Sequence, residues 1–240
     1  MFKGKKVIIF DMDGTLIDSI GIWNQVDIEL IKEIGYLDEL EENDIQKQRD
    51  DKLREFSKSE NPYLDYCKFL SSKYGNNITG EETLTKRYDI SQNYLKNKID
   101  YKKDVPKLLR LLKEKNYTMV IASTTRRKNI DTYCNENINI ISKANIKDYF
   151  SRVYTREDVK ELKPNPEVYL KVLKELKVKK EQCLIFEDSL IGIDAAINAG
   201  IEVVAMYDKY SDMDREEINK KATYNINNYG EVIQHLLQES

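Results

Sequence analysis

The sequence predicts an α/β fold in which an all-helical domain is inserted into a doubly wound parallel sheet. From about residue 102, short β-rich runs alternate with helical segments, which is typical of parallel sheets. Between about residues 18 and 99, apolar residues recur at helical spacing and almost no β-rich run interrupts them. We therefore expect a core domain of residues 1–17 and 101–240, and a helical domain of residues 18–100.

Short apolar runs mark the strands of the core domain, and the first of them is Val7 to Phe10. Helices with readable ends lie between the strands. One follows Asp104 as a candidate cap and has Pro106 in its first turn, and another opens at Pro166. The further strands are expected at residues 118–122, 152–154, 183–186, 202–206 and 222–226. The apolar face of the helix after Pro166 would comprise Val168, Leu170, Val172, Leu173 and Leu176.

The inserted domain reads as four helices. The first is amphipathic and stops at Gly35, and the second covers roughly Asp38 to Ser57. A break at Asn61-Pro62 precedes a third helix, from Tyr63 to Tyr74. Thr79 and Glu82 form a capping-box pattern that opens a last helix to about Ile99. The apolar face of the first helix comprises Ile20, Trp23, Val26, Leu30, Ile31 and Ile34.

Composition excludes several classes of function. The 240 residues carry 39 basic and 42 acidic side chains, a net charge of -3, so nucleic acid is not an expected partner. No apolar stretch could cross a bilayer, and the short run after the N-terminal basic cluster is no export signal. Three widely spaced cysteines suggest neither disulfides nor zinc and fit a reducing cytoplasm. His235 is the only histidine, so any catalysis depends on carboxylates, lysine and a metal.

Two acids, Asp11 and Asp13, follow the first strand directly. Acids alone are common before helices as turn and cap residues. Here they stand where a parallel strand leaves the core, which is the usual place for a site in an open α/β sheet. Gly14 follows them, and glycine allows the backbone to approach an anion closely. The segment therefore predicts a site for a metal and a phosphate.

Three further strand ends carry matching features. Ser123-Thr124 follows the strand 118–122, where a hydroxyl and a helix N-terminus could bind phosphate, although plain capping explains the pair as well. Lys163 precedes a proline, which holds it extended, and could reach a phosphate or a carboxylate. Glu187-Asp188 ends the strand 183–186. Four carboxylates at two strand ends, with no histidine or cysteine near, predict a Mg²⁺ site.

These segments resemble the four motifs of the haloacid dehalogenase-like hydrolase superfamily, in the branch with a helical cap inserted after the first strand. They are FDMDGTLIDS, VIAST, KPNPEVY and IFEDSLIGIDAA, in that order over essentially the whole chain. The resemblance implies a Rossmann-like core, with Asp11 as the nucleophile that forms an aspartyl-phosphate and Asp13 as the general acid and base. It also implies that Ser123 and Lys163 hold the phosphoryl oxygens. Mg²⁺ would be held by Asp11, the backbone carbonyl of Asp13, Glu187 and Asp188.

Within this family the sequence favours a phosphatase of a small phosphorylated metabolite. Dehalogenases lack the second acid of the first motif, so Asp13 indicates phosphoryl chemistry. A phosphomutase similar to β-phosphoglucomutase is the alternative. The first motif of that enzyme resembles FDLDGV, whereas this chain has FDMDGT, and Thr15 therefore favours a phosphatase. A non-catalytic metabolite-binding protein is less expected, because it would need neither acid. We expect a monomer or a homodimer.

The helical cap is harder to interpret. Arg49 stands near a stretch similar to the one that supplies a substrate-binding arginine in the mutases, and Trp23 could line a pocket. A solvated arginine paired with a nearby acid, and a tryptophan in the core of the cap, explain the two residues at least as well. Both are therefore candidate substrate residues only.

Overall fold

The computed structural model describes residues 1–56 and 59–238, with no description of the Arg54 side chain. The chain forms two compact units. The core unit comprises Met1–Ile20 and Ile99–Ser240, and the cap unit comprises Gly21–Lys98. Each unit is described by itself below.

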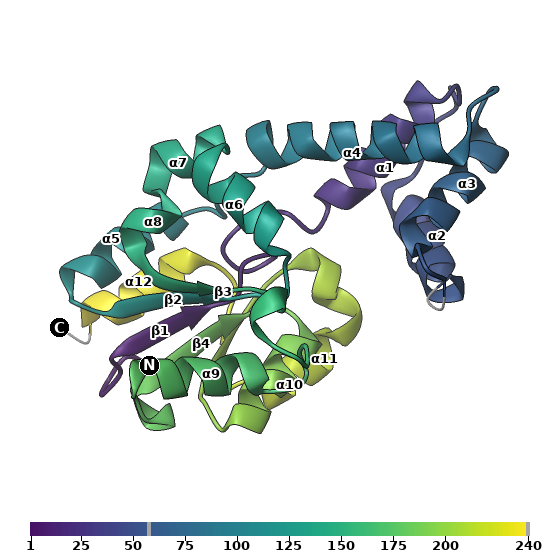
Figure 1. The fold of residues 1–240 in the computed structure, drawn as a ribbon. Coiled ribbons are helices and arrows are strands. Elements are labelled where there is room, and N and C mark those ends of the chain that lie inside the picture. Colours follow the sequence, from purple (N-terminus) through teal and green to yellow (C-terminus); the bar gives the residue numbers. More distant parts are fainter. Residues whose placement is uncertain (57–58, 239–240) are drawn as a thin grey trace. The chain divides into compact units, whose positions relative to one another are not determined.

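A six-stranded, entirely parallel sheet forms the centre of the core unit, in the order β3-β2-β1-β4-β5-β6 (Figure 1). The chain starts in the middle of the sheet and continues outward first on one side and then on the other, which is the doubly wound topology. β1 is consequently buried along its whole length, and Ile8, Ile9 and Phe10 have no exposed surface. The strands are β1 (Val7–Phe10), β2 (Thr118–Ala122), β3 (Phe150–Tyr154), β4 (Cys183–Glu187), β5 (Val203–Met206) and β6 (Tyr224–Ile226).

Helices cover both faces of this sheet. Apolar side chains of α9, α10 and α11 pack under one face, where Val172 and Ile193 meet Ile9 and Ile185. On the other side, α5 packs against β2 and α12 packs against both α5 and β6. The helices of the core unit are α5 (Val105–Glu114), α6 (Arg127–Asn135), α7 (Ile138–Ala144), α8 (Ile146–Tyr149), α9 (Glu167–Leu176), α10 (Leu190–Ala199), α11 (Arg215–Lys221) and α12 (Tyr229–Gln238). Three short 3-10 helices lie at Arg156–Asp158, Lys180–Gln182 and Lys209–Asp214.

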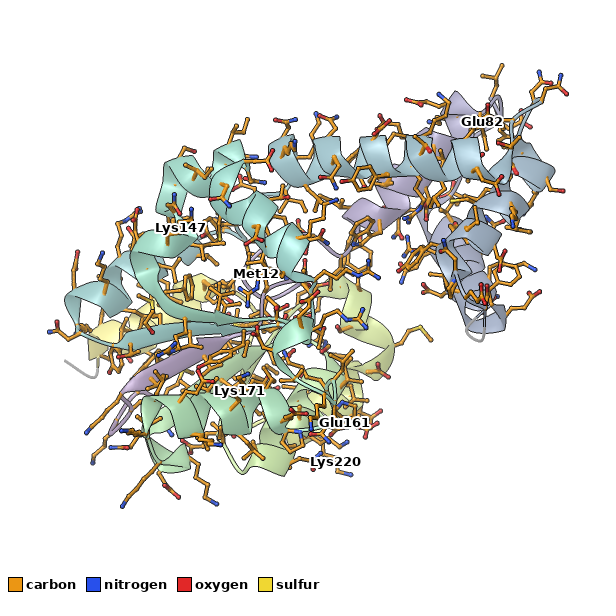
Figure 2. The ribbon with its side chains drawn as sticks, viewed as in Figure 1. Met12, Glu82, Lys147, Glu161, Lys171 and Lys220 are labelled. Atoms are coloured by element: carbon orange, nitrogen blue, oxygen red, sulfur yellow. The ribbon has the colours of Figure 1, made fainter. Side chains whose placement is uncertain are left out.

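The described residues of the cap unit form four helices, around an apolar core that includes Val26, Leu30 and Tyr66. The expected capping box is present, since the Thr79 hydroxyl accepts from the Glu82 backbone and the Glu82 carboxylate accepts from the Thr79 backbone. Glu82 is labelled in Figure 2. The helices are α1 (Ile22–Glu33), α2 (Glu42–Glu55), α3 (Pro62–Tyr74) and α4 (Gly80–Asn97). None of the helices in the described part of the chain is long and apolar enough to cross a membrane.

Several local predictions are wrong. Leu170 is 46% exposed, and Tyr169, one position earlier, takes the inward place on α9. Asp104 precedes α5 in a left-handed conformation, with φ of 67°, and its side chain makes no capping hydrogen bond. Ile20 lies before α1, and α2 begins at Glu42 instead of Asp38. The predicted end of that helix, Ser57, lies outside the described residues.

Candidate functional site

The predicted site residues of the core unit meet at the carboxyl ends of three adjacent strands, β2, β1 and β4. Asp11 continues β1, and its backbone N–H donates to Phe186 of β4 at 3.0 Å. Ser123 continues β2, while Glu187 ends β4. Met12, labelled in Figure 2, lies between the two acids and is fully buried, so it anchors the loop in the core. The strands therefore bring together side chains that are up to 177 positions apart, since Asp188 belongs to the same cluster as Asp11.

Lys163 is the centre of this cluster. Its Nζ donates to Asp11 Oδ1 at 2.6 Å, to Glu187 Oε1 at 2.7 Å and to the carbonyl oxygen of Ala122 at 2.9 Å. The Lys163 side chain is only 2% exposed. One ammonium group is thus shared between two buried carboxylates, and negative charge remains in excess around it.

Asp11, Glu187 and Asp188 can each place a carboxylate oxygen within 4.8 Å of the others. Asp188 Oδ1 accepts from the Thr15 hydroxyl at 2.6 Å. Its other oxygen, Oδ2, is buried and has no hydrogen-bond partner among the described residues. A buried carboxylate oxygen without a donor is costly, and a divalent cation would satisfy it. The residues present therefore fit a hard cation such as Mg²⁺.

Glu187 differs from Asp188, because both of its oxygens already have donors. Oε1 accepts from Lys163 and, at 3.4 Å, from the Tyr169 hydroxyl. Oε2 accepts from the backbone N–H groups of Asp188 and Ser189 and from the Ser189 hydroxyl, at 3.0 to 3.2 Å. The geometry therefore suits Glu187 for orienting Lys163 as much as for holding a cation.

Two glycines allow these carboxylates to lie where they do. A Cβ on Gly14, whose φ is +80°, would lie 2.4 Å from Asp188 Oδ2. A Cβ on Gly192 of α10 would lie 1.9 Å from Glu187 Oε1. Gly14 was predicted as a phosphate-binding residue. In the structure its lack of a side chain also leaves room for the Asp188 carboxylate.

Burial dominates the electrostatics of the acids. It raises the pKa of Asp11 to about 7, with Glu187 adding to the increase and Lys163 opposing it. Burial and the neighbouring Glu187 charge raise the pKa of Asp188 well above its usual range. The pKa of Lys163 is raised as well. Burial alone would lower it, but the charges of Asp11 and Glu187 raise it by more. The cluster holds more acids than one lysine can keep ionised, and a cation would supply the missing charge.

Asp13 is held differently. Its Oδ1 accepts from the Ser19 hydroxyl at 2.5 Å, and its Oδ2 accepts from the Thr125 hydroxyl. The ion pairs of Lys163 involve Asp11 and Glu187. The two acids of the first motif therefore have partners of different chemistry, an ammonium for Asp11 and hydroxyls for Asp13.

The two hydroxyl residues after β2, Ser123 and Thr124, differ in burial. Ser123 is buried, and its Oγ accepts from the backbone N–H of Thr125 at 3.1 Å. Thr124 is half-buried. Ser123 follows Ala122, whose carbonyl oxygen accepts from Lys163.

The two candidate substrate residues of the cap belong to one ion-pair cluster inside the cap unit. Arg49 Nη1 lies 3.3 Å from Asp27 Oδ2, and Arg87 Nε lies 2.7 Å from Asp27 Oδ1. Trp23 packs over Arg87, with 5.6 Å from its ring centroid to the guanidinium carbon. Arg49 is largely buried, with a side chain that is 12% exposed, and it pairs with the fully buried Asp27. It also lies 3.7 Å from the exposed carboxylate of its neighbour Asp50, so pairing with a nearby acid accounts for part of its environment.

Sequence reasoning missed several residues that contact the site, among them Ser19 and Ser189, whose hydroxyls donate to Asp13 and Glu187. Thr125, Tyr169 and Gly192 each touch a predicted residue, and Thr15 was read only as a sign of the subfamily. Thr15, Tyr169 and Gly192 lie inside the motifs and Thr125 directly follows one, and this was the one available signal. Asp194, in the IFEDSLIGIDAA segment, pairs with Lys221 at 2.7 Å.

Comparisons with known proteins show the family of the chain. The sequence model of the family "Haloacid dehalogenase-like hydrolase" matches residues 8–206. Glyceraldehyde 3-phosphate phosphatase of Pyrococcus furiosus is 27% identical over 252 aligned positions, which cover 98% of this chain and 94% of that protein. Phosphorylated carbohydrates phosphatase of Thermotoga maritima is 34% identical over 98 residues, 41% of this chain and 42% of that protein.

Among solved structures, the fold resembles a Thermotoga maritima protein assigned provisionally as a β-phosphoglucomutase. The TM-score is 0.75 and the identity 22%, with 98% of this chain and 99% of the other covered. That likeness extends to the whole fold, with its parallel sheet and helical cap. Because the family match spans most of the sequence, the chain belongs to the haloacid dehalogenase-like hydrolase family and is an enzyme.

Proposed function

We propose that this enzyme is a Mg²⁺-dependent phosphatase of a small phosphorylated metabolite and that it acts through an aspartyl-phosphate on Asp11. The observation that carries the proposal is the Lys163 cluster, with its surplus of buried carboxylates and the unpaired Asp188 oxygen. The relatives named as phosphatases of phosphorylated carbohydrates and of glyceraldehyde 3-phosphate support a substrate of this class.

The proposed metal ligands are Asp11, the backbone carbonyl of Asp13, and Asp188, with Glu187 as a ligand or as the residue that orients Lys163. Mg²⁺ bound there would neutralise the phosphate and lower the barrier to attack by an anion. Lys163 and the Ser123 hydroxyl would hold the phosphoryl oxygens, together with the backbone near Gly14 and Thr124. In phosphoryl transfer, positioning and charge neutralisation supply most of the rate.

The proposed reaction has two steps. An Asp11 carboxylate oxygen forms a bond to phosphorus as the bond to the leaving oxygen breaks, and Asp13 gives its proton to that oxygen. Asp13, now ionised, then takes a proton from water, whose oxygen attacks the phosphorus of the aspartyl-phosphate and releases inorganic phosphate. The hydroxyl partners of Asp13 support this division of roles, because they fit both of its protonation states.

A phosphomutase is the second candidate, since the fold resembles a protein assigned provisionally as a β-phosphoglucomutase. The chemistry at Asp11 would be the same, and a sugar hydroxyl would replace water as the acceptor. Conversion of β-glucose 1-phosphate to glucose 6-phosphate without release of phosphate would favour the mutase.

The test is a phosphate-release assay on sugar phosphates, phosphoglycolate and nucleotides, with Mg²⁺ and with EDTA. We expect turnover of at least one substrate with Mg²⁺, none with EDTA, and none for Asp11→Asn. Asp194→Asn is the matched control, because Asp194 makes a surface ion pair with Lys221. Full activity of Asp11→Asn would contradict the proposed mechanism, and turnover in EDTA would contradict its metal dependence.

A further inference from the structure

Thr15 limits how Asp188 can bind a cation. Its hydroxyl donates to Asp188 Oδ1 at 2.6 Å, and neither residue is more than 1% exposed. The hydroxyl therefore occupies one carboxylate oxygen and leaves Oδ2, the oxygen without a partner, as the one available to a ligand. A valine in this place would have nearly the same shape but no donor.

A hydrogen bond from α12 holds the Thr15 backbone in place. The hydroxyl of Tyr229, at the start of α12, donates to the Thr15 carbonyl oxygen at 3.0 Å. Tyr229 is buried and packs against Phe186 of β4, with the ring centroids 6.2 Å apart. A chain of hydrogen bonds thus runs from Tyr229 through Thr15 to Asp188.

The other acids of the cluster are limited in the same way. Asp11 Oδ1 accepts from Lys163, and both oxygens of Glu187 accept from protein donors. None of the three carboxylates can turn both oxygens toward one cation without losing a buried hydrogen bond. The cluster therefore favours binding through a single oxygen of each carboxylate.

The common divalent cations differ in this requirement. Mg²⁺ demands near-octahedral geometry at about 2.0–2.1 Å and is usually held by one or two carboxylates. Ca²⁺ takes about 6–8 oxygens at longer distances and often binds both oxygens of a carboxylate. A carboxylate that already accepts a hydroxyl hydrogen bond on one oxygen therefore suits Mg²⁺ and disfavours Ca²⁺.

We propose that Thr15 is a positioning residue that makes this site selective for Mg²⁺ over Ca²⁺, by keeping Asp188 a single-oxygen ligand. The proposal rests on the proposed function only in taking the cluster as a cation site. It also gives a physical reason for a threonine at this position of the first motif.

The test is calorimetric titration of the full, substrate-free chain with Mg²⁺ and separately with Ca²⁺, for the wild type, Thr15→Val and Thr15→Ser. Loss of a residue that orients a metal ligand typically weakens metal binding about 10- to 100-fold, and we expect this for Mg²⁺ with Thr15→Val. Ca²⁺ should lose much less, so the ratio of the two dissociation constants shifts by about tenfold or more. Thr15→Ser keeps the hydroxyl and should keep the ratio within roughly threefold of the wild type.

Equal weakening of both ions by Thr15→Val would overturn the proposal, because a merely structural role affects both alike. A shift in the ratio of the two dissociation constants that is as large in Thr15→Ser as in Thr15→Val would overturn it too. If Thr15→Val does not fold, Tyr229→Phe loosens the same hydrogen-bond chain and should shift the ratio in the same direction. Metal binding without phosphate release from any substrate would refute the phosphatase alone, whereas a wild type that binds neither ion would refute the cation site and this proposal together.

Discussion

The hydroxyl of Thr125 donates a hydrogen bond to the Oδ2 oxygen of Asp13. A second hydroxyl, that of Ser19, donates to Oδ1 of the same carboxylate at 2.5 Å. A hydroxyl can donate to a carboxylate and, after rotation, accept from a carboxylic acid, whereas an ammonium can only donate. Asp13 is thus held by groups that tolerate transfer of its proton, while Asp11 faces Lys163 and must present an acceptor oxygen.

Replacing Thr125 with valine should therefore impair substrates that need a protonated leaving group. General acid catalysis contributes about 10²- to 10⁴-fold, and misplacing the acid should cost part of this, on the order of tenfold in kcat/KM for an alkyl phosphate. Because p-nitrophenyl phosphate has a leaving group that needs little protonation, its kcat/KM should change less than about threefold. Since kcat/KM reports events up to transfer of the phosphoryl group to Asp11, later hydrolysis does not blur the comparison.

Thr125→Ser is the matched control and should behave as the wild type with both substrates, since it keeps the hydroxyl. Ser19→Ala should show the same discrimination as Thr125→Val. An equal loss on the alkyl and the aryl phosphate would argue that Thr125 supports the loop and not Asp13.

Removal of the central ammonium should destabilise the metal-free protein. Lys163→Met leaves the buried carboxylates of Asp11 and Glu187 without their shared cation, and breaking a buried ion pair typically costs about 3–5 kcal/mol. Urea unfolding in EDTA measures this loss, and Mg²⁺ should restore part of it. Lys171→Met, at a half-buried lysine of α9 that is labelled in Figure 2, should cost less than about 1 kcal/mol. If the Lys163→Met protein were as stable in EDTA as the wild type, the buried carboxylates of Asp11 and Glu187 would not need the Lys163 ammonium for stability.

The raised pKa of Asp11 predicts how pH affects stability and metal binding. Burial raises this pKa from its ordinary value of 3.8 to about 7, so the folded protein binds the proton more tightly than the unfolded chain. The stability of the metal-free protein should accordingly fall as pH rises from about 4 to about 7. Below pH 7, Mg²⁺ must displace this proton, and its affinity should rise with pH by up to about tenfold per unit.

Calorimetry at pH 6 in two buffers with different ionisation enthalpies would count the released protons. We expect a release on Mg²⁺ binding at pH 6 and little at pH 8. Equal Mg²⁺ affinity at the two pH values would contradict the assignment of Asp11 as a ligand.

The four inner strands, β1, β2, β4 and β5, could be predicted because each is a short apolar run that is buried almost throughout. The edge strands β3 and β6 carry exposed residues and have a weaker pattern. β1 and β2 have the predicted bounds, and the others differ by one to two residues at their ends. Leu170 shows the limit of a pattern. An apolar residue at helical spacing can face solvent when a larger neighbour, here Tyr169, fills the inward position.

The placement of the site residues follows from the same topology, since carboxyl ends of adjacent parallel strands share one edge. Which atom bonds which could not be predicted. The contacts of Thr125 with Asp13 and of Thr15 with Asp188 span 112 and 173 positions and depend on rotamers. In the cap, nothing in the sequence links Asp27 with Arg87, which is 60 positions away, and only the packed fold reveals that they are partners.

Gly192→Ala should test the close approach of α10 to Glu187. Alanine normally stabilises a helix interior relative to glycine, by roughly 1 kcal/mol. Here the added Cβ would lie 1.9 Å from Glu187 Oε1, so we expect the opposite sign, a loss of about 1–3 kcal/mol from overpacking. Ile197→Ala, at a 43% exposed position of the same helix, is the control and should change stability by less than about 1 kcal/mol. Thermal unfolding of both variants measures the difference, and a stabilised Gly192→Ala would refute the contact.

Asp27 should prove essential to the cap although it lies outside the proposed chemistry. Its side chain is fully buried and accepts from Arg87 at 2.7 Å, from Arg49 at 3.3 Å and from the Tyr66 hydroxyl at 3.2 Å. Asp27→Asn keeps the shape but removes the buried anion that two guanidinium groups share, which typically costs about 3–5 kcal/mol, although Arg49 keeps Asp50 at 3.7 Å.

The chain has a single tryptophan, Trp23, whose ring centroid lies 5.6 Å from the Arg87 guanidinium carbon. Tryptophan fluorescence therefore reports on this cluster, and urea unfolding followed in this way should show Asp27→Asn unfolding at clearly lower urea than the wild type. Asp89→Asn, at an exposed position of α4, should match the wild type. If Asp27→Asn also matched it, the two arginines would not need Asp27 as their anion, and the proposed role of Asp27 in the stability of the cap would be wrong.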